Sequence, residues 1–377
     1  MIMLTRKYYL DAIDTSFLVN PICALLGPRQ CGKTTLSKQY AEKNKLPTHF
    51  FDLEDPIDLS KLDNPKLTLE PLEGLIVIDE IQRKEELFPY LRVLVDKFPK
   101  KRILVLGSAS QDLIRQSSET LAGRISYIEM TPFSIHETDD IKKLWYRGGF
   151  PKSYLASTEI ISSQWRKSYI RTFLERDIRN FGFDIPPQTM RRFWSMLAHY
   201  HGQIFNASEI GRSINVSYKT SDRYLDILTG TFMVRRLSPW FENLSKRQIK
   251  SPKIYFRDSG LLHTILGIEN HEDLLKHPKL GASWEGMALE QVIKHMEVEN
   301  DDCYFWATQG GAELDLLILK NSKKLGFEIK YTDSPKITKS MRIAIEDLGL
   351  DNLTIVIPGT EKFKLEKNIE VCGIENL

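Results

Sequence analysis

GPRQCGKTT, residues 27–35, is the stretch that decides the fold of the first third of this chain. An apolar run, ICALLG (22–27), leads into it, and a helical pattern over residues 33–44 follows it. In the order strand, glycine-rich loop, helix, backbone amides and the positive end of the helix dipole face the same point. This order distinguishes a phosphate-binding loop from a chance match to its spacing. The stretch therefore predicts a P-loop.

The side chains of this loop predict a site for ATP and Mg²⁺. Lys33 is expected to reach the β- and γ-phosphates, and the Thr34 hydroxyl is expected to ligate Mg²⁺. The predicted nucleotide-binding residues are Gly27, Pro28, Arg29, Gln30, Cys31, Gly32, Lys33, Thr34 and Thr35.

Three further apolar runs, at 48–53, 74–80 and 102–108, alternate with helical patterns. Runs of this kind are typical of parallel strands that are buried on both faces, as in a doubly wound sheet. The predicted fold class of this part is therefore α/β.

Two acids end the strand LIVIDE (75–80). Asp79 is predicted to hold Mg²⁺ indirectly, by contacting a group that binds the metal. Glu80 is predicted to polarise the attacking water. Two adjacent acids that merely open a loop are the alternative.

Two polar residues further along are candidates for the same site. Ser108 ends the next strand, where its hydroxyl could touch the γ-phosphate or the water; its alternative role is to cap the helix that follows. Arg124 is predicted to act as an arginine finger on a neighbouring subunit, worth roughly 10³ to 10⁵ in rate. Arg115 and a plain surface role are the alternatives. A finger acting in trans implies a homo-oligomer, in the form of a ring.

The middle of the chain, residues 207–240, has the order helix, turn, helix, hairpin that is typical of a winged helix-turn-helix. Its second helix would present Tyr218, Lys219 and Arg223 to DNA. The stretch 235–257 has seven basic residues against one acid, by subtraction an excess of +6 in a chain that totals +2: Arg235, Arg236, Lys246, Arg247, Lys250, Lys253 and Arg257 against Glu242. Such an excess predicts contact with phosphate backbones. A winged helix that contacts only protein is the alternative, and Asp222 and Asp226 would repel phosphates.

The C-terminal part has the order helix, three strands, helix, strand, which is the core of restriction-endonuclease-like nucleases. In ELDLLILKNSKKLGFEIK (313–330), Asp315 lies on the first strand and Glu328 and Lys330 on the second. The carboxylates of Asp315, Glu328 and Glu285, from the preceding helix, suit Mg²⁺ or Mn²⁺. Lys330 could orient or deprotonate a water molecule. Glu290 is the second choice for the helix acid, Glu313 could be an outer, solvated acid, and carboxylates that no longer cut are the alternative.

Several segments together are similar to those of one known family. GPRQCGKTTL (27–36), LIVIDEIQ (75–82), LGSAS (106–110) and LAGRISYIEMTPFS (121–134) resemble the bacterial and archaeal AAA-type ATPases whose C-terminal half has an endonuclease-like fold. The resemblance continues through GGFP (148–151) and KIYFRDSGLL (253–262) to the C-terminal hairpin. It implies an AAA-type domain at 1–145, a helical region with a winged helix at 146–250 and a nuclease-like domain at 251–377.

The amino-acid composition indicates the cellular compartment. The four cysteines have no paired or metal-ligand spacing, which suits a reducing compartment. We expect a cytoplasmic protein with no signal peptide and no membrane span. The expected function is an ATP-hydrolysing motor that acts on DNA, with cleavage by the C-terminal domain. The alternative is an ATP-gated switch or scaffold whose nuclease-like domain binds DNA or protein without cutting.

Overall fold

The structure is a computed structural model, and it describes residues 4–45, 47–108, 119–241 and 249–377. The chain divides into two compact units. The first comprises Met1–Phe133 with Gly230–Phe232, and the second comprises Ser134–Thr229 with Met233–Leu377. Each unit is described by itself.

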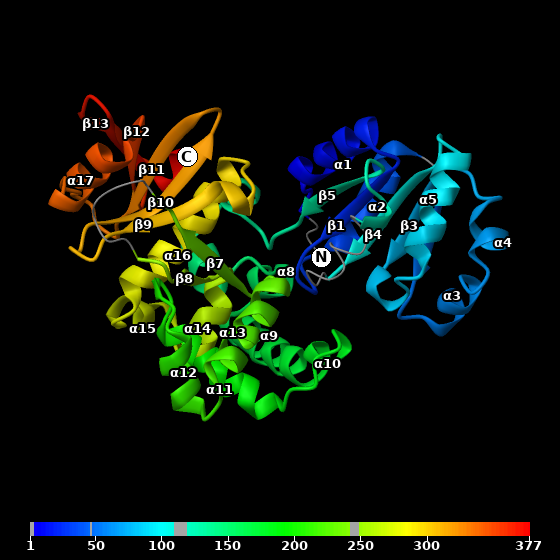
Figure 1. Ribbon diagram of the computed structural model, residues 1–377, viewed down its shortest axis with the longest axis horizontal. Coiled ribbons are helices and arrows are strands. Elements are labelled where there is room, and N and C mark those ends of the chain that lie inside the picture. Colours follow the sequence, from blue (N-terminus) through cyan, green and yellow to red (C-terminus); the bar gives the residue numbers. More distant parts are fainter. Residues whose placement is uncertain (1–3, 46, 109–118, 242–248) are drawn as a thin grey trace. The chain divides into compact units, whose positions relative to one another are not determined.

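A parallel sheet forms the centre of the first unit (Figure 1). Its strand order is β2-β3-β4-β1-β5 among the described residues, and all neighbouring pairs are parallel. The strands are β1 (Ile22–Leu26), β2 (Thr48–Asp52), β3 (Leu75–Asp79), β4 (Arg102–Gly107) and β5 (Ile125–Glu129). The helices are α1 (Lys7–Val19), α2 (Lys33–Asn44), α3 (Pro56–Lys61), α4 (Pro65–Leu69), η1 (Ile81–Arg83) and α5 (Leu87–Lys97). The predicted α/β class is confirmed.

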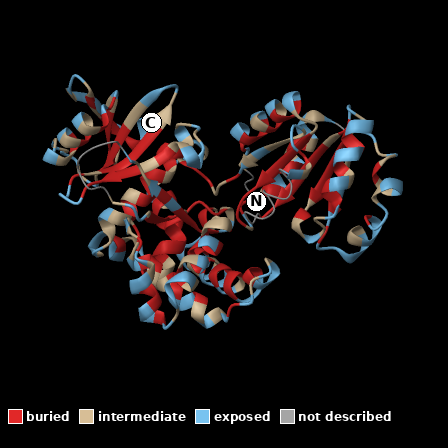
Figure 2. Cartoon of the chain, viewed as in Figure 1, coloured by how far each residue is buried: buried red, intermediate tan, exposed pale blue. Residues whose placement is uncertain are grey.

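Alternation along the strands divides the apolar residues between two cores. Cys23 and Leu25 of β1 pack in a core shared with α1 and α2. Ile22, Ala24 and Leu26 pack in a second core, shared with α5. The three inner strands, β3, β4 and β1, are consequently buried on both faces, and helices cover each face (Figure 2). This burial is why β1, β3 and β4 appear in the sequence as nearly unbroken apolar runs.

A mixed sheet runs through the second unit. Its order is β13-β14-β12-β11-β10-β9-β7-β8-β6 among the described residues. The strands are β6 (Gln203–Ile204), β7 (Val234–Pro239), β8 (Lys253–Phe256), β9 (Cys303–Ala307), β10 (Glu313–Lys320), β11 (Lys323–Ile329), β12 (Asn352–Ile357), β13 (Lys362–Glu366) and β14 (Ile369–Gly373). The expected run of three strands, helix and strand is present as β9, β10, β11, α17 and β12.

Helices cover both faces of the C-terminal part of this sheet. Residues of α16 pack with Leu316 and Ile318 in one core, and residues of α17 pack with Leu314 and Leu317 in another. The helices of this unit are η2 (Ile135–Glu137), α7 (Ile141–Arg147), α8 (Pro151–Tyr154), α9 (Glu159–Thr172), η3 (Phe173–Asp177), α10 (Ile178–Asn180), α11 (Pro187–His199), α12 (Ala207–Ile214), α13 (Tyr218–Gly230), α14 (Ser259–Ile265), α15 (His271–Lys276), α16 (Leu280–His295), η4 (Asn300–Asp302), α17 (Lys339–Leu348) and η5 (Ile374–Asn376). The helix expected over 159–180 contains a π-helical segment, η3.

The middle region and the C-terminal region share this sheet. Helices α12 and α13 are separated by Asn215, which caps α12 in the left-handed conformation. Strands β7 and β8, expected as a wing, pair antiparallel with each other, and β7 also pairs parallel with β9. Position 250, the expected boundary between two domains, lies between these paired strands.

Candidate functional site

The P-loop is shaped by two glycines that no other residue could replace without strain. A Cβ atom on Gly27 would lie 2.1 Å from the carbonyl oxygen of Met130. Gly32 has a φ of +104° at the start of α2, a conformation that residues with a side chain rarely adopt. These two positions bring the loop backbone into a tight turn at the amino terminus of a helix, as the sequence predicts.

The side chain of Lys33 is held in place by hydrogen bonds to the backbone of the P-loop. Its side chain is buried, and Nζ donates hydrogen bonds to the carbonyl oxygens of Gly27 and Pro28, both at 2.9 Å. The ammonium group therefore lies at the same turn that presents the loop amides.

Thr34 and Asp79 converge from different elements. Thr34 lies in the first turn of α2, and its hydroxyl donates to Asp79 Oδ2, at the end of β3, across 2.6 Å. Asp79 Oδ1 accepts from the backbone N–H of Glu80 at 2.9 Å. Burial raises the pKa of Asp79 above its ordinary value. A hydroxyl beside a carboxylate is a set of hard oxygen ligands, so these residues fit Mg²⁺.

Glu80 is held in an unusual conformation by its neighbours. Its φ of 55° lies in the left-handed region, which costs a non-glycine residue about 1–3 kcal/mol. Ser108 Oγ donates to Glu80 Oε2 at 3.1 Å, and the Gln82 amide donates to the same oxygen. Arg29 lies 3.6 Å from Oε1 of Glu80. The candidates Glu80 and Ser108 thus share one polar network, to which Gln82 is an addition that the sequence did not suggest.

Arg124 forms a two-point contact within its own chain. Its Nε and Nη2 donate to Asp96 of α5 at 2.7 and 3.0 Å. Both residues line an open cavity of about 600 Å³, together with Arg92 and Glu119. The alternative finger, Arg115, lies outside the described residues, as does the helix that Ser108 was expected to cap.

The second unit brings the predicted nuclease residues together. Lys330 Nζ lies 2.9 Å from Glu328 Oε2 and 3.7 Å from Asp315 Oδ2. Asp315 Oδ2 also accepts from the backbone N–H of Ile329 at 2.9 Å. The register between β10 and β9 shifts between Leu314 and Leu317, at the position of Asp315. Bulges of this kind re-aim a side chain, and here the irregularity coincides with an acid of the cluster.

A residue that the sequence analysis did not place in this cluster lies inside it. The side chain of Lys253, on β8, is 4% exposed, and Nζ contacts Glu313. The same nitrogen lies 3.7 Å from Glu285 Oε1 and 3.8 Å from Asp315 Oδ1. Two residues further along the strand, the Tyr255 hydroxyl donates to Glu285. Strand β8 thus supplies two donors to acids that come from α16 and β10.

The acids of this cluster are coupled by burial and charge. Burial, with the charge of Asp315 added to it, raises the pKa of Glu285 to about 7 and the pKa of Glu328 well above its ordinary value. Burial acts in the same direction on Asp315, but the charges of Lys253 and Lys330 outweigh it and lower the pKa of that carboxyl.

The arrangement of Glu285, Asp315 and Glu328 does not match the predicted metal site. Among the residues described, no three His, Cys, Asp or Glu side chains are placed to hold a metal ion. The three acids contact lysine ammonium groups instead, one from β8 and one that follows β11. As arranged, they fit an ammonium group better than a divalent cation.

The basic stretch at 235–257, predicted to contact DNA, forms several ion pairs within the fold. Four of its side chains form ion pairs: Arg235 and Arg257 with Glu290, Arg236 with Asp222 and Asp226, and Lys253 with the acids above. Lys246 and Arg247 lie outside the described residues. Counting charges along the sequence missed the acids that α13 and α16 bring to this stretch. Glu290, the second choice for a metal ligand, instead forms ion pairs with Arg235 and Arg257.

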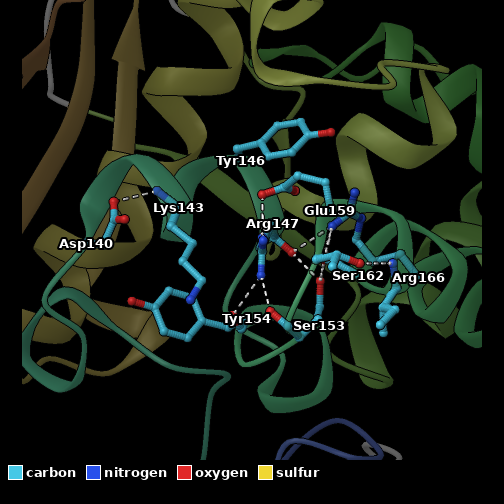
Figure 3. Close-up of polar contacts among 12 residues, drawn as sticks. Asp140, Lys143, Tyr146, Arg147, Ser153, Tyr154, Glu159, Ser162 and Arg166 are labelled. Atoms are coloured by element: carbon cyan, nitrogen blue, oxygen red, sulfur yellow. Dashed lines mark hydrogen bonds and ion pairs between the residues drawn. The ribbon is translucent and has the colours of Figure 1, made fainter.

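A further polar cluster stabilises the bend at GGFP (Figure 3). Arg166 donates to Ser162 Oγ at 2.6 Å and to Ser153 Oγ at 3.2 Å, and Ser153 donates to the carbonyl of Arg147 at 2.7 Å. Arg147 in turn donates to Glu159 at 2.6 Å. These bonds join α7, α8 and α9, so we assign the cluster a structural role.

In the described part of the chain, no helix has the length and apolar character needed to cross a membrane.

Comparison with known proteins agrees with the geometry of the P-loop. Residues 19–138 match the model of an AAA domain, while residues 138–272 and 280–377 match two models described as domains of unknown function. The Walker-type ATPase PABY2304 of Pyrococcus abyssi superposes with a TM-score of 0.51 at 15% identity, over 70% of this chain and 96% of that one. The fold is therefore shared, and the first unit is an AAA-type P-loop ATPase domain.

Two relatives define the family more closely. The chain is 49% identical over 352 residues to the uncharacterized protein Rv2008c of Mycobacterium tuberculosis and to the uncharacterized protein Mb2031c of Mycobacterium bovis. The match spans 93% of this chain and 79% of each relative. The chain belongs to the family of these two mycobacterial proteins.

Proposed function

We propose that the protein hydrolyses ATP at the P-loop of its first unit. The observation that carries the proposal is the convergence of Lys33, Thr34 and Asp79 on one turn. Lys33 would bind the β- and γ-phosphates, while Thr34 and Asp79 would hold Mg²⁺. The metal, when bound with ATP, supplies positive charge against the phosphate oxygens.

Glu80 is the group that would act on water. Ser108 and Gln82 fix its Oε2 oxygen, so the carboxylate is positioned before substrate arrives. A positioned carboxylate can accept a hydrogen bond from the attacking water and polarise it. Ser108 lies at the end of the neighbouring strand. A change at the γ-phosphate would be transmitted to Glu80 through the hydrogen bond between Ser108 and Glu80.

We further propose that Arg124 completes the site of a neighbouring subunit in a homo-oligomer. The guanidinium is partly exposed on the face that carries the 600 Å³ cavity. Asp96 holds it through two parallel hydrogen bonds, which pre-orders a planar group suited to phosphate oxygens.

ATP turnover would drive action on DNA through a winged helix-turn-helix in the second unit. Support comes from α13, where Tyr218, Lys219 and Arg223 are all exposed near the amino terminus of the second helix. The test is ATPase activity measured with linear, single-stranded and branched DNA. Stimulation by at least one substrate is expected, together with its loss in Lys219→Ala/Arg223→Ala. Turnover indifferent to every DNA would contradict the proposal and favour an ATP-gated switch or scaffold.

A second candidate function is phosphodiester cleavage by the C-terminal region, which would then be a restriction-endonuclease-like domain. The observation that favours it is the contact of Lys330, expected to act on water, with Glu328 and Asp315, two of the three acids expected to bind the metal. The lysine contacts of the cluster support the alternative, in which this domain binds DNA or a protein partner without cutting.

A further inference from the structure

Strand β8 brings a buried lysine to the centre of the acidic cluster, and the described fold holds it there. Lys253 pairs in the sheet with Leu237 of β7 on one side and Ile204 of β6 on the other. Its ammonium also lies 5.6 Å from the centre of the Phe305 ring, which favours a cation at this point. Both neighbouring strands fix the backbone of Lys253, and its side chain is buried beside the acids.

The distances within the cluster suit an ammonium group. The nitrogen of Lys253 lies 3.7 and 3.8 Å from the nearest oxygens of Glu285 and Asp315. Ligand oxygens lie about 2.0–2.1 Å from Mg²⁺. A metal at the same point would require both carboxylates to move inward by well over 1 Å and the lysine to leave.

The charges lead to the same conclusion. Four acids lie in the cluster with two lysines: Glu285, Glu313, Asp315 and Glu328 with Lys253 and Lys330. Buried carboxylates need a compensating cation. Lys330 contacts Glu328 and Asp315, whereas Lys253 contacts Glu285, Glu313 and Asp315.

We propose that Lys253 is a built-in cation that occupies the position a divalent metal would otherwise take between Glu285, Glu313 and Asp315. The inference rests on the assignment of this cluster as the C-terminal site. It makes the wild-type cluster a weak site for Mg²⁺ or Mn²⁺ and makes Lys253 the residue that sets metal affinity. A partner or substrate would be bound there by a metal-free arrangement of acids and lysines.

The test is Mn²⁺ binding to the full chain without nucleotide, followed by electron paramagnetic resonance. Lys253→Met keeps the apolar stem and removes the charge, and we expect it to gain a Mn²⁺ site at least about tenfold tighter than any in wild type. Adding Asp315→Asn should abolish the gained site, which assigns it to the cluster rather than to the P-loop. Lys330→Met removes an equal charge from the same cluster, where it shares only Asp315 with Lys253, and leaves Lys253 in place. A gain as large as that of Lys253→Met would overturn the proposal.

A second test does not use the Lys253 variant. Mn²⁺ should shift the unfolding temperature of wild type and of Asp315→Asn equally; a shift that depends on Asp315 would overturn the proposal. DNA cleavage is scored separately in each protein. If Lys253→Met gains Mn²⁺ binding but no protein cleaves DNA, only the nuclease function is contradicted. If DNA is cleaved but Lys253→Met has the same Mn²⁺ affinity as wild type, only the role of Lys253 is contradicted.

Discussion

The Thr34 hydroxyl donates a hydrogen bond to the Asp79 carboxylate across 2.6 Å, joining the first turn of α2 to the end of β3. The residues adjacent to Thr34 and Asp79 in the sequence supply the other groups of the site. Lys33 precedes Thr34 at the loop, and Glu80 follows Asp79 in the network with Ser108. In the proposed mechanism, phosphate binding and water activation would therefore depend on one contact between a helix and a strand.

Lys33→Ala should lower ATP turnover by at least about a hundredfold, because a positive charge aimed at the transferring phosphate is lost. Steady-state phosphate release is the measurement. Lys38→Ala removes an exposed lysine from the same helix and should stay near wild type. Unchanged hydrolysis in Lys33→Ala would contradict the phosphate-site assignment.

Arg124→Ala should lower turnover by roughly 10³-fold or more if the arginine acts on a neighbouring subunit. Mixing this variant with Lys33→Ala should restore activity, because each inactive chain supplies the part that the other lacks. Arg92→Ala, on the same cavity, is the matched control and should remain active. Failure of the mixture to recover any turnover would exclude a role in trans.

The nuclease candidate is tested by incubating wild type and Asp315→Ala with linear, single-stranded and branched DNA in Mg²⁺ or Mn²⁺. If the C-terminal region cuts DNA, cleavage by wild type should fall at least about a hundredfold in the variant, since Asp315 joins Lys330 to the rest of the cluster. Glu366→Ala, which removes an exposed acid of β13, is the control. Equal cleavage by both proteins, or no cleavage by either, would contradict the nuclease function. It would favour the alternative, in which the domain binds DNA or a protein partner without cutting.

The second unit should lose stability in acid through two buried histidines. Burial lowers the pKa of His201 and His263 from 6.5 to about 3, so only the unfolded chain binds their protons between these values. The free energy of unfolding should therefore fall as pH drops below 6.5, by about 1.4 kcal/mol per pH unit for each histidine, until the folded-state pKa is reached.

Tryptophan fluorescence isolates this effect, because all six tryptophans lie after residue 134, in the second unit. Urea unfolding of His263→Gln should show a slope with pH shallower by about 1.4 kcal/mol per unit than that of wild type. His199→Gln replaces an exposed histidine and should keep the wild-type slope. Identical slopes in wild type and His263→Gln would contradict a buried, uncharged His263.

The first sheet was predictable where burial is symmetric. Strands β1, β3 and β4 were expected within one or two residues of their bounds, because burial on both faces removes polar residues from the run. The edge strand β2 was expected within the same margin, although most of its side chains are only partly buried or exposed. The edge strand β5 was not predicted, since its side chains alternate between partly buried and exposed. For the same reason β13, with mostly exposed side chains, gave no apolar signal.

The second site could be predicted only in part. Asp315, Glu328 and Lys330 lie close in the sequence, and strand periodicity was enough to place them together. Lys253 lies more than 60 residues from Asp315, and in KIYF it was counted with a basic stretch. Its burial depends on acids from α16 and β10, which no local pattern indicates. A lysine at the start of an otherwise apolar strand was the available signal.

The central claim, ATP hydrolysis through Glu80, is tested most directly by single-turnover hydrolysis in Glu80→Gln with ATP binding measured in parallel. The amide keeps the shape of the side chain but cannot accept a proton from water. The account predicts ATP affinity within about threefold of wild type and hydrolysis slower by about 10² or more. Hydrolysis at the wild-type rate with ATP bound would contradict it.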